Sequence, residues 1–146
     1  MLKLDGRPFT SSRSKYSDHV PQRLEPTAKI YVRISFEGMD RVVTAQLDTG
    51  AAWSILGSET AERLGLFSEP GETVRLLTSF GIKEGVLVRV PLKIVADEGE
   101  SLDVTGTFFV APDWPEGLTF LGYSGLLDSF RFALDPQVND FYFGRY

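Results

Sequence analysis

The stretch Leu47-Asp48-Thr49-Gly50-Ala51 carries the most information about how this chain folds. An acid followed by a hydroxyl residue and a glycine suits a carboxylate on a tight loop, because glycine permits a sharp turn and a close approach of another backbone. The Thr49 hydroxyl can bond to a neighbouring backbone group, and the apolar flanks lower the local dielectric constant. The same triplet is also a good turn sequence, so its surroundings have to decide between a turn and a site.

The residues before the triplet alternate as in a β-strand. The stretch 29–36 places Ile30, Val32, Ile34 and Phe36 on one face, as expected for a strand with one buried side. A short polar turn follows, and the chain returns as the second arm of a predicted hairpin. The hairpin therefore presents the acid of the triplet at the end of a strand.

Short strands dominate the rest of the chain. A short helix is predicted with Ser58 as its N-cap and Gly65 placed to end it, and Leu126 opens a second short helix. The remaining pattern predicts strands at 73–78, 86–96, 102–111, 118–122, 130–134 and 140–143, with turns at 79–85, 97–100 and 112–117. Many short strands with one or two short helices indicate an all-β fold whose sheets close into a barrel-like shape.

The N-terminus and the composition restrict the classes of function. Residues 1–26 are polar and have no hydrophobic period, so we predict an irregular arm before a domain at 27–146. The arm lacks the apolar centre of a signal peptide, and no stretch is long enough to span a bilayer, which predicts a cytoplasmic protein without a membrane partner. A net charge of -5 argues against a nucleic-acid partner.

Metal and cofactor chemistry is not expected. The chain has no cysteine, and its one histidine, His19, lies in the polar arm. Thiolate metal sites are therefore excluded, and a Ser-His mechanism is disfavoured. The acidic run Asp97, Glu98, Glu100 and Asp103 lacks the pattern of a calcium loop, and we predict a solvated turn there.

The order and spacing of several segments resemble the retropepsin-like aspartic proteases, the single-domain relatives of the retroviral enzymes. The resemblance runs from about Ile30 to Leu134 and implies the retropepsin-like acid-protease fold, with a flap hairpin over a peptide cleft. The segments that carry it are the catalytic loop at 45–51, the strand at 53–56, the flap strand and tip at 76–81, the strand at 106–110, and the apolar-apolar-Gly signature at 120–122 with its helix at 126–127.

The resemblance also implies roles for individual residues. In this family two aspartates about 3 Å apart share one proton, so that the ionised member activates water and the protonated member bonds to the peptide carbonyl oxygen. The implied catalytic residues are Asp48, Thr49 and Gly50. The implied substrate-binding residues are Ala51 beside the triplet, Thr78, Ser79, Phe80, Gly81 and Ile82 at the flap tip, and Phe120, Leu121 and Gly122 at the second signature.

The chain holds one such triplet. The stretch Leu127-Asp128-Ser129 begins like a second copy, but Phe130 follows where a glycine is required. If Asp48 is catalytic, the enzyme has to be a homodimer that cleaves peptide or protein substrates. The apolar stretch 141–143 is either an interface strand between the two copies or a strand that closes its own sheet.

Two departures from the family pattern leave alternatives open. Viral members usually carry an acid two residues after the glycine of the triplet and an arginine after the second signature, and here these positions are Ala52 and Tyr123. A retropepsin-fold binding or dimerisation module without proteolysis is therefore the alternative function. A third interpretation is an unrelated β-barrel with an Asp-Thr-Gly turn, in which Asp48 would not lie beside the Phe120–Gly122 strand.

Overall fold

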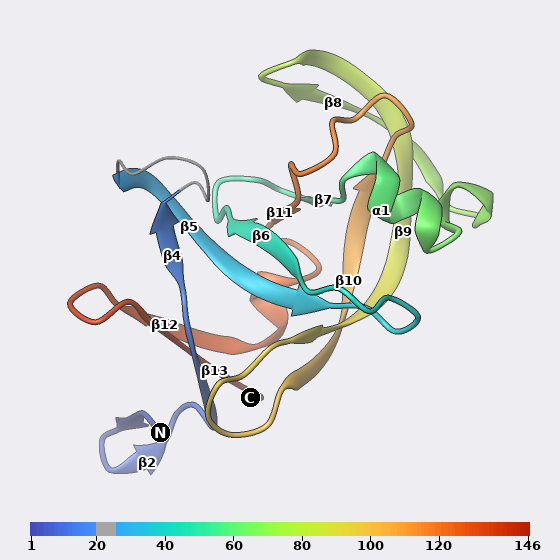
Figure 1. Ribbon diagram of the computed structural model, residues 1–146. Helices are drawn as coiled ribbons and strands as arrows, with labels where there is room; N and C mark the ends of the chain where they lie inside the picture. The colour runs from blue at the N-terminus through green and yellow to red at the C-terminus, as the bar shows by residue number, and fades with distance from the viewer. Residues whose placement is uncertain (20–25) are drawn as a thin grey trace.

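The structure is a computed structural model that describes residues 1–19 and 26–146 (Figure 1). Its helical segments are short, namely α1 (Ser58–Arg63) and the 3-10 turns η1 (Leu66–Ser68) and η2 (Leu127–Ser129). The strands are β1 (Lys3–Leu4), β2 (Arg7–Pro8), β3 (Ser12–Lys15), β4 (Ser17–His19), β5 (Pro26–Ser35), β6 (Val43–Leu47), β7 (Ser54–Ile55), β8 (Glu72–Thr78), β9 (Gly81–Ile94), β10 (Leu102–Val110), β11 (Phe120–Leu121), β12 (Arg131–Asp135) and β13 (Asp140–Gly144). The predicted all-β class is confirmed. Among the described residues, no helix is long and apolar enough to cross a membrane.

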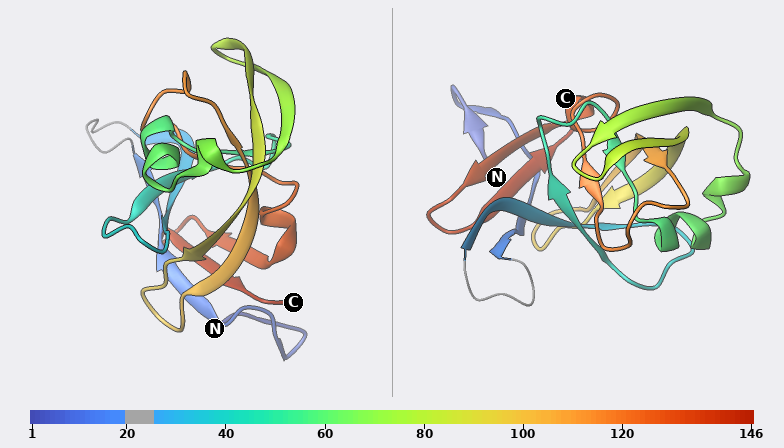
Figure 2. Two further views of the ribbon diagram at one scale, coloured as in Figure 1. Left: turned by 90° about the vertical axis from the view of Figure 1, so that its right-hand side faces the viewer. Right: turned by 90° about the horizontal axis from the view of Figure 1, so that it is seen from above.

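The main sheet curls round until it meets itself (Figures 1 and 2). Within the described residues it has eight strands in the order β4-β5-β6-β11-β7-β10-β9-β8. An additional pairing joins β5 to β9, with Ile34 opposite Ile94 and Ser35 opposite Lys93. This pairing closes β5, β6, β11, β7, β10 and β9 into a ring, so the predicted barrel-like closure takes the form of a ring of strands.

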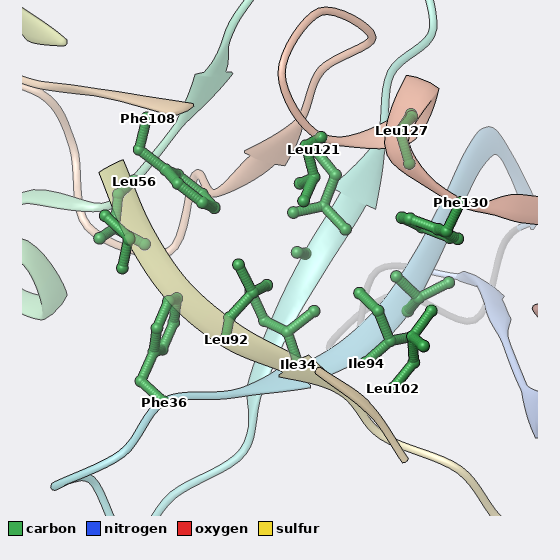
Figure 3. Close-up of a cluster of buried hydrophobic side chains, with 14 of the residues drawn as sticks. Ile34, Phe36, Leu56, Leu92, Ile94, Leu102, Phe108, Leu121, Leu127 and Phe130 are labelled. Carbon is green, nitrogen blue, oxygen red and sulfur yellow. The ribbon is translucent and has the colours of Figure 1, made fainter. Parts of the chain in front are cut away.

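The ring encloses a core built from the inward faces of its strands (Figure 3). Val32 and Ile34 of β5 are fully buried and Phe36 is 4% exposed, as their alternation predicted. Phe36 packs edge-on against Phe108 of β10, with ring centroids 6.3 Å apart. Leu121 of β11 is fully buried in the same cluster. Because each such side chain contributes about 1.5–3 kcal/mol when buried, the core fixes the strands that carry the Asp-Thr-Gly triplet.

The N-terminal segment forms strands that the sequence did not predict. β3 pairs with β13, with Ser14 opposite Phe141, and β4 pairs with β5. β1 also pairs with β2, so the irregular conformation expected for residues 1–26 is wrong for β1 to β4, and residues 20–25 lie outside the described chain. The buried face of β3 consists of Ser12 and Ser14, which are 2% and 0% exposed. Small polar residues on the buried face leave no hydrophobic period to detect.

An ionic cluster holds β3 in place. Arg13 contacts Asp140 at 3.0 Å and Glu98 at 2.7 Å, and the Lys15 ammonium contacts Asp140 at 2.6 Å. Hydrogen bonds from Lys15 and then Arg13 hold the pKa of Asp140 below its ordinary value. The backbone amide of Lys15 donates to Asp97, which lowers the pKa of that carboxyl as well. The acidic run predicted to be a solvated turn is exposed, but its first two members also bind the N-terminal strand.

The C-terminal strand β13 is the middle strand of a small sheet. β12 pairs with one of its edges and β3 with the other. Phe141 and Phe143 are fully buried. Of the two alternatives for residues 141–143, closure of the chain's own sheet is confirmed. An interface strand is wrong, because both edges are already paired within the chain.

Strands β8 and β9 form a long hairpin that projects beyond the ring (Figures 1 and 2). Its turn consists of Ser79 and Phe80, so the turn predicted at 79–85 is too long. The Thr78 hydroxyl accepts a hydrogen bond from the Phe80 amide and donates one to the Gly81 carbonyl oxygen. Gly81 has φ +92°, a conformation that favours glycine, and it begins the returning strand.

Candidate active site

Three short strands hold the loop that carries Asp48. β11 lies between β6 and β7, parallel to the first and antiparallel to the second. The amide of Asp48 donates to the Leu121 carbonyl oxygen at 2.9 Å, and the amide of Gln46 donates to the Thr119 carbonyl oxygen at 2.9 Å. Asp48 therefore lies beside the second signature strand, which contradicts the interpretation as an unrelated β-barrel.

The loop after β6 is closed by its own backbone. The Ala51 amide donates to the Asp48 carbonyl oxygen at 3.1 Å, and the Gly50 amide donates to Oδ1 of the Asp48 carboxylate at 3.1 Å. Asp48 is half-buried, while Thr49 and Gly50 are exposed. In the part of the chain that the structure describes, the Thr49 hydroxyl forms no hydrogen bond, so the predicted bond to a neighbouring backbone group is not found. The loop thus fixes one carboxylate oxygen and presents Thr49 and Gly50 outward.

Two glycines of the site have different roles. A Cβ atom added to Gly122 would lie 2.4 Å from the backbone carbon of Trp53 and 2.5 Å from its oxygen. Only glycine therefore allows β11 and the loop before β7 to pack together. Gly50 does not have a positive φ, and a Cβ there would meet only Oδ1 of Asp48, at 3.4 Å. The turn itself therefore accommodates a side chain at position 50, and the close approach of another chain or a substrate to Gly50 stays a prediction.

Backbone hydrogen bonds join the Asp48 loop to the segment after β11. The Tyr123 amide donates to the Ala51 carbonyl oxygen, and the Ser124 amide donates to the Ala52 carbonyl oxygen, both at 2.9 Å. The Gly122 amide donates to the fully buried hydroxyl of Ser54. The two positions that depart from the viral pattern are therefore neighbours, and neither carries a charge.

Two of the predicted substrate-binding residues, Phe120 and Leu121, lie on opposite faces of strand β11. Leu121 is fully buried, and its partner Leu47 packs against the same core. Phe120 is half-buried and pairs with Gln46 on one side and Ile55 on the other. Because successive side chains of a strand point to opposite faces, Phe120 faces outward and Leu121 inward. The predicted substrate contacts stay predictions for both residues, with the Phe120 side chain the more accessible of the two.

The tip of the β8–β9 hairpin contacts the loop between β10 and β11, which lies beside it in both views (Figures 1 and 2). The Phe80 ring packs edge-on against Trp114 at 5.5 Å between centroids, and Trp114 packs against Phe120 at 6.2 Å. The Lys83 ammonium contacts the Asp113 carboxylate at 3.1 Å. Three aromatic rings in series thus connect the hairpin tip to β11, and an ion pair strengthens the connection.

Most of the hairpin tip is open to solvent. Phe80 is 52% exposed and Ile82 is 64% exposed, and Ser79 and Gly81 are exposed as well. The Thr78 side chain is occupied in closing the turn. The predicted flap residues therefore form one continuous exposed element, which the Phe80 ring anchors on one side.

Helix α1 is capped by a residue far away in the sequence. Glu116 accepts hydrogen bonds from the amides of Glu59 and Thr60 at 2.7 and 3.1 Å, and from the Thr60 hydroxyl at 2.9 Å. The prediction of Ser58 as N-cap is wrong, because Ser58 is the first helical residue and forms no capping bond. The predicted end at Gly65 is confirmed by its left-handed φ of 70°. Glu116 thereby fixes the loop that carries Trp114.

Sequence reasoning missed Glu116 as part of the site, and it left open whether Trp114 covers the substrate or caps the sheet. Trp114 is 3% exposed and lies in a second core cluster. Glu116 is exposed and precedes a glycine, which is typical of an ordinary loop. Glu116 carries no local signal, since its partners Glu59 and Thr60 lie more than fifty positions away in the sequence.

Comparison with known proteins identifies the family. A sequence model of the family described as aspartyl protease matches residues 32–114, which is more than half of the chain. The matched range contains the Asp48 loop and the β8–β9 hairpin. The chain therefore belongs to the aspartyl protease family. A search of curated proteins found no match.

Among solved structures, the chain is similar to the crystal structure of a retropepsin-like aspartic protease from Rickettsia conorii. The two share 20% sequence identity with a TM-score of 0.51, over 78% of this chain and 88% of that one. At this level of identity the similarity concerns the fold. The retropepsin-like fold that the sequence segments implied is thereby confirmed.

Proposed function

We propose that the protein is an aspartic endopeptidase that acts as a homodimer, in which Asp48 of one copy meets Asp48 of the second. The observation that carries this proposal is the position of the triplet, on a loop bonded to β11 in a member of the aspartyl protease family. The sequence contains one acid-hydroxyl-glycine triplet, and this chemistry needs two carboxylates. A second copy of the chain supplies the missing one.

The proposed reaction is a direct attack of water on the peptide bond. Two carboxylates about 3 Å apart share a single proton. The ionised one takes a proton from water while the water oxygen bonds to the carbonyl carbon, and the protonated one donates a hydrogen bond to the carbonyl oxygen. The C–N bond then breaks as the amine nitrogen takes up a proton. The products are a carboxylic acid and an amine.

The exposed side of the Asp48 loop supports the proposal that a second copy of the chain binds there. Thr49 and Gly50 face solvent, and no contact within the described chain requires a glycine at position 50. A glycine there suits a surface on which another backbone has to come close. The exposed backbone of residues 78–82 suits strand-like hydrogen bonds to an extended peptide. We therefore assign the flap role to this hairpin tip.

The substitution Asp48→Asn tests the proposal. It removes the ionisable group and keeps the shape, so cleavage of a diverse peptide mixture should disappear while the fold is retained. Asp128→Asn is the matched control, because Asp128 follows a leucine in the same way and only accepts a bond from the Gly125 amide. Persistent cleavage by Asp48→Asn that pepstatin does not inhibit would contradict the proposal.

A binding or dimerisation module without proteolysis is the second candidate. Ala52 and the 52% exposed Tyr123 favour it, because they leave the loop without the charged pair that organises viral dimers. Molecular mass in solution separates the two candidates. A protein that stays monomeric at high concentration and cleaves no peptide between pH 3 and 8 favours the module.

We further propose that residues 27–146 form the protease domain and that the protein acts in the cytoplasm. The absence of cysteine suits a reducing compartment. The ion pairs of Arg13 and Lys15 suit a segment that is added to the domain and clamped on it.

A further inference from the structure

A groove of about 560 Å³ lies on the outer face of β5 and β6, and Gln46 and Phe120 belong to its lining. Its floor crosses three neighbouring strands, because Tyr31 of β5 pairs with Gln46 of β6, and Gln46 pairs with Phe120 of β11. Gln46 precedes Asp48 by two residues, and side chains two apart on a strand share a face. The groove therefore begins at the candidate active site and follows β6 away from it.

The far end of this groove is positively charged. Arg41 lines it together with the apolar residue Val42. Lys29 lines the other end, because the register of β5 on β6 places position 29 level with Asp48. The one acid in the lining, Glu116, is already bound to the first amides of helix α1. Within residues 1–19 and 26–146, no carboxylate lies within ion-pair distance of Arg41. The charge that the groove can offer a ligand is therefore positive.

We propose that this groove binds the part of the peptide substrate remote from the scissile bond, and that Arg41 selects an acidic side chain there. The inference rests on the proposed protease function. The aromatic floor formed by Tyr31 and Phe120 suits apolar side chains near the cleavage point. A guanidinium at the end suits a carboxylate, which it can bind through two hydrogen bonds.

The geometry also sets the distance between the acid and the cleaved bond. The path from Asp48 back to Arg41 covers seven residues, which is roughly 23 Å at about 3.3 Å per extended residue. Because the Arg41 side chain can reach back along the groove, an extended peptide spans the gap with about five to seven residues. A two-fold axis through the paired Asp48 residues would place one groove on each side, so acids are preferred both before and after the bond.

A matched set of peptides tests the inference. The peptides share one apolar centre and carry Glu, Gln or Lys singly at the fifth to seventh position on either side. The protein prefers Glu over Gln by about threefold in kcat/KM, with Lys poorest, as expected for one exposed ion pair. Arg41→Gln abolishes this preference, and Arg41→Glu reverses it. Arg63→Gln is the control, because Arg63 is an exposed arginine on α1 outside the groove.

The outcomes separate this inference from the proposed function. Cleavage with the same order of peptides in Arg41→Glu as in the unmodified protein overturns the groove inference and leaves the protease function intact. If no peptide is cleaved, the proposed function fails. The same peptides, labelled with a fluorophore, are then titrated with the protein to test whether the groove binds them. Tighter binding of Glu peptides that Arg41→Glu reverses supports the groove, and equal binding overturns it.

Discussion

The Asp48 loop and the tip of the β8–β9 hairpin are held by different kinds of contact. Backbone hydrogen bonds from Asp48, Gly122 and Tyr123 connect the loop to neighbouring segments within a buried framework. The hairpin tip is exposed and rests on one aromatic contact, Phe80 against Trp114, and one ion pair. Backbone contacts between short strands fix a carboxylate in position, whereas a few side-chain contacts can be made and broken. The structure therefore combines a half of the site held by backbone hydrogen bonds, the rigid half, with a half held by a few side-chain contacts.

The largest expected effect comes from breaking the rigid half. Gly122→Ala places a methyl group against the backbone of Trp53, which cannot move without separating β11 from β7. The free energy of unfolding should fall by about 3 kcal/mol, as for severe overpacking. Urea denaturation measures it. Gly50→Ala is the control and should cost less than about 1 kcal/mol, because its Cβ meets only Asp48 Oδ1.

Under the proposed function, Gly50→Ala nevertheless loses dimerisation and activity, because the glycine faces the second copy. Equal unfolding midpoints for the two alanine variants would contradict the rigid-framework interpretation.

A smaller effect is expected at the loop that supports the hairpin. Glu116→Ala removes the cap of helix α1 and should lower the free energy of unfolding by about 1–2 kcal/mol. Thermal denaturation followed by circular dichroism checks it. Glu59→Ala is the control. The Glu59 side chain makes a long, exposed contact with Arg63, and the substitution keeps the Glu59 amide that donates to Glu116. A loss at Glu59 as large as that at Glu116 would show that acidity near the helix, and not the cap, matters.

The hairpin tip should be the easiest part to release. Phe80→Ala removes the edge-on contact with Trp114, which is worth about 0.5–1 kcal/mol, so global stability changes little. Amide hydrogen exchange in residues 78–82 should nevertheless become faster. Leu77→Ala, at an 85% exposed position of the same hairpin, should leave exchange unchanged. Unchanged exchange in Phe80→Ala would mean that the ring does not anchor the tip.

The smallest expected effect is the weakening of the contacts of strand β3 when the pH is lowered. The carboxyls of Asp97 and Asp140 have pKa values below the ordinary 3.8, so their contribution to stability is complete above that pH. It is lost as the pH falls from about 4 through their pKa values in the folded state. The protection of β3 amides against exchange, taken relative to the intrinsic rate at each pH, should therefore fall below pH 4, and Asp140→Asn should weaken this pH dependence. Protection as high at pH 3 as at pH 6 would contradict the role of these ion pairs in holding β3.

The sequence predicted those parts of the molecule that rest on local patterns. Alternation in β5 identified Val32 and Ile34 as core residues, and the triplet with its second signature indicated the pairing of β6 with β11. Strand β3 was not predicted, because its buried face consists of Ser12 and Ser14 and therefore has no hydrophobic period. The helix cap formed by Glu116 was not predicted either, since it depends on a contact with Thr60, which lies 56 positions away in the sequence.

The distance between the two Asp48 carboxylates in a crystal of the protein's own dimer tests the dimer proposal most directly. Nearest oxygens about 3 Å apart, close enough to share one proton, are the predicted result. Carboxylates that lie beyond hydrogen-bond reach of each other in the dimer, or a protein that remains monomeric at crystallisation concentrations, would contradict it.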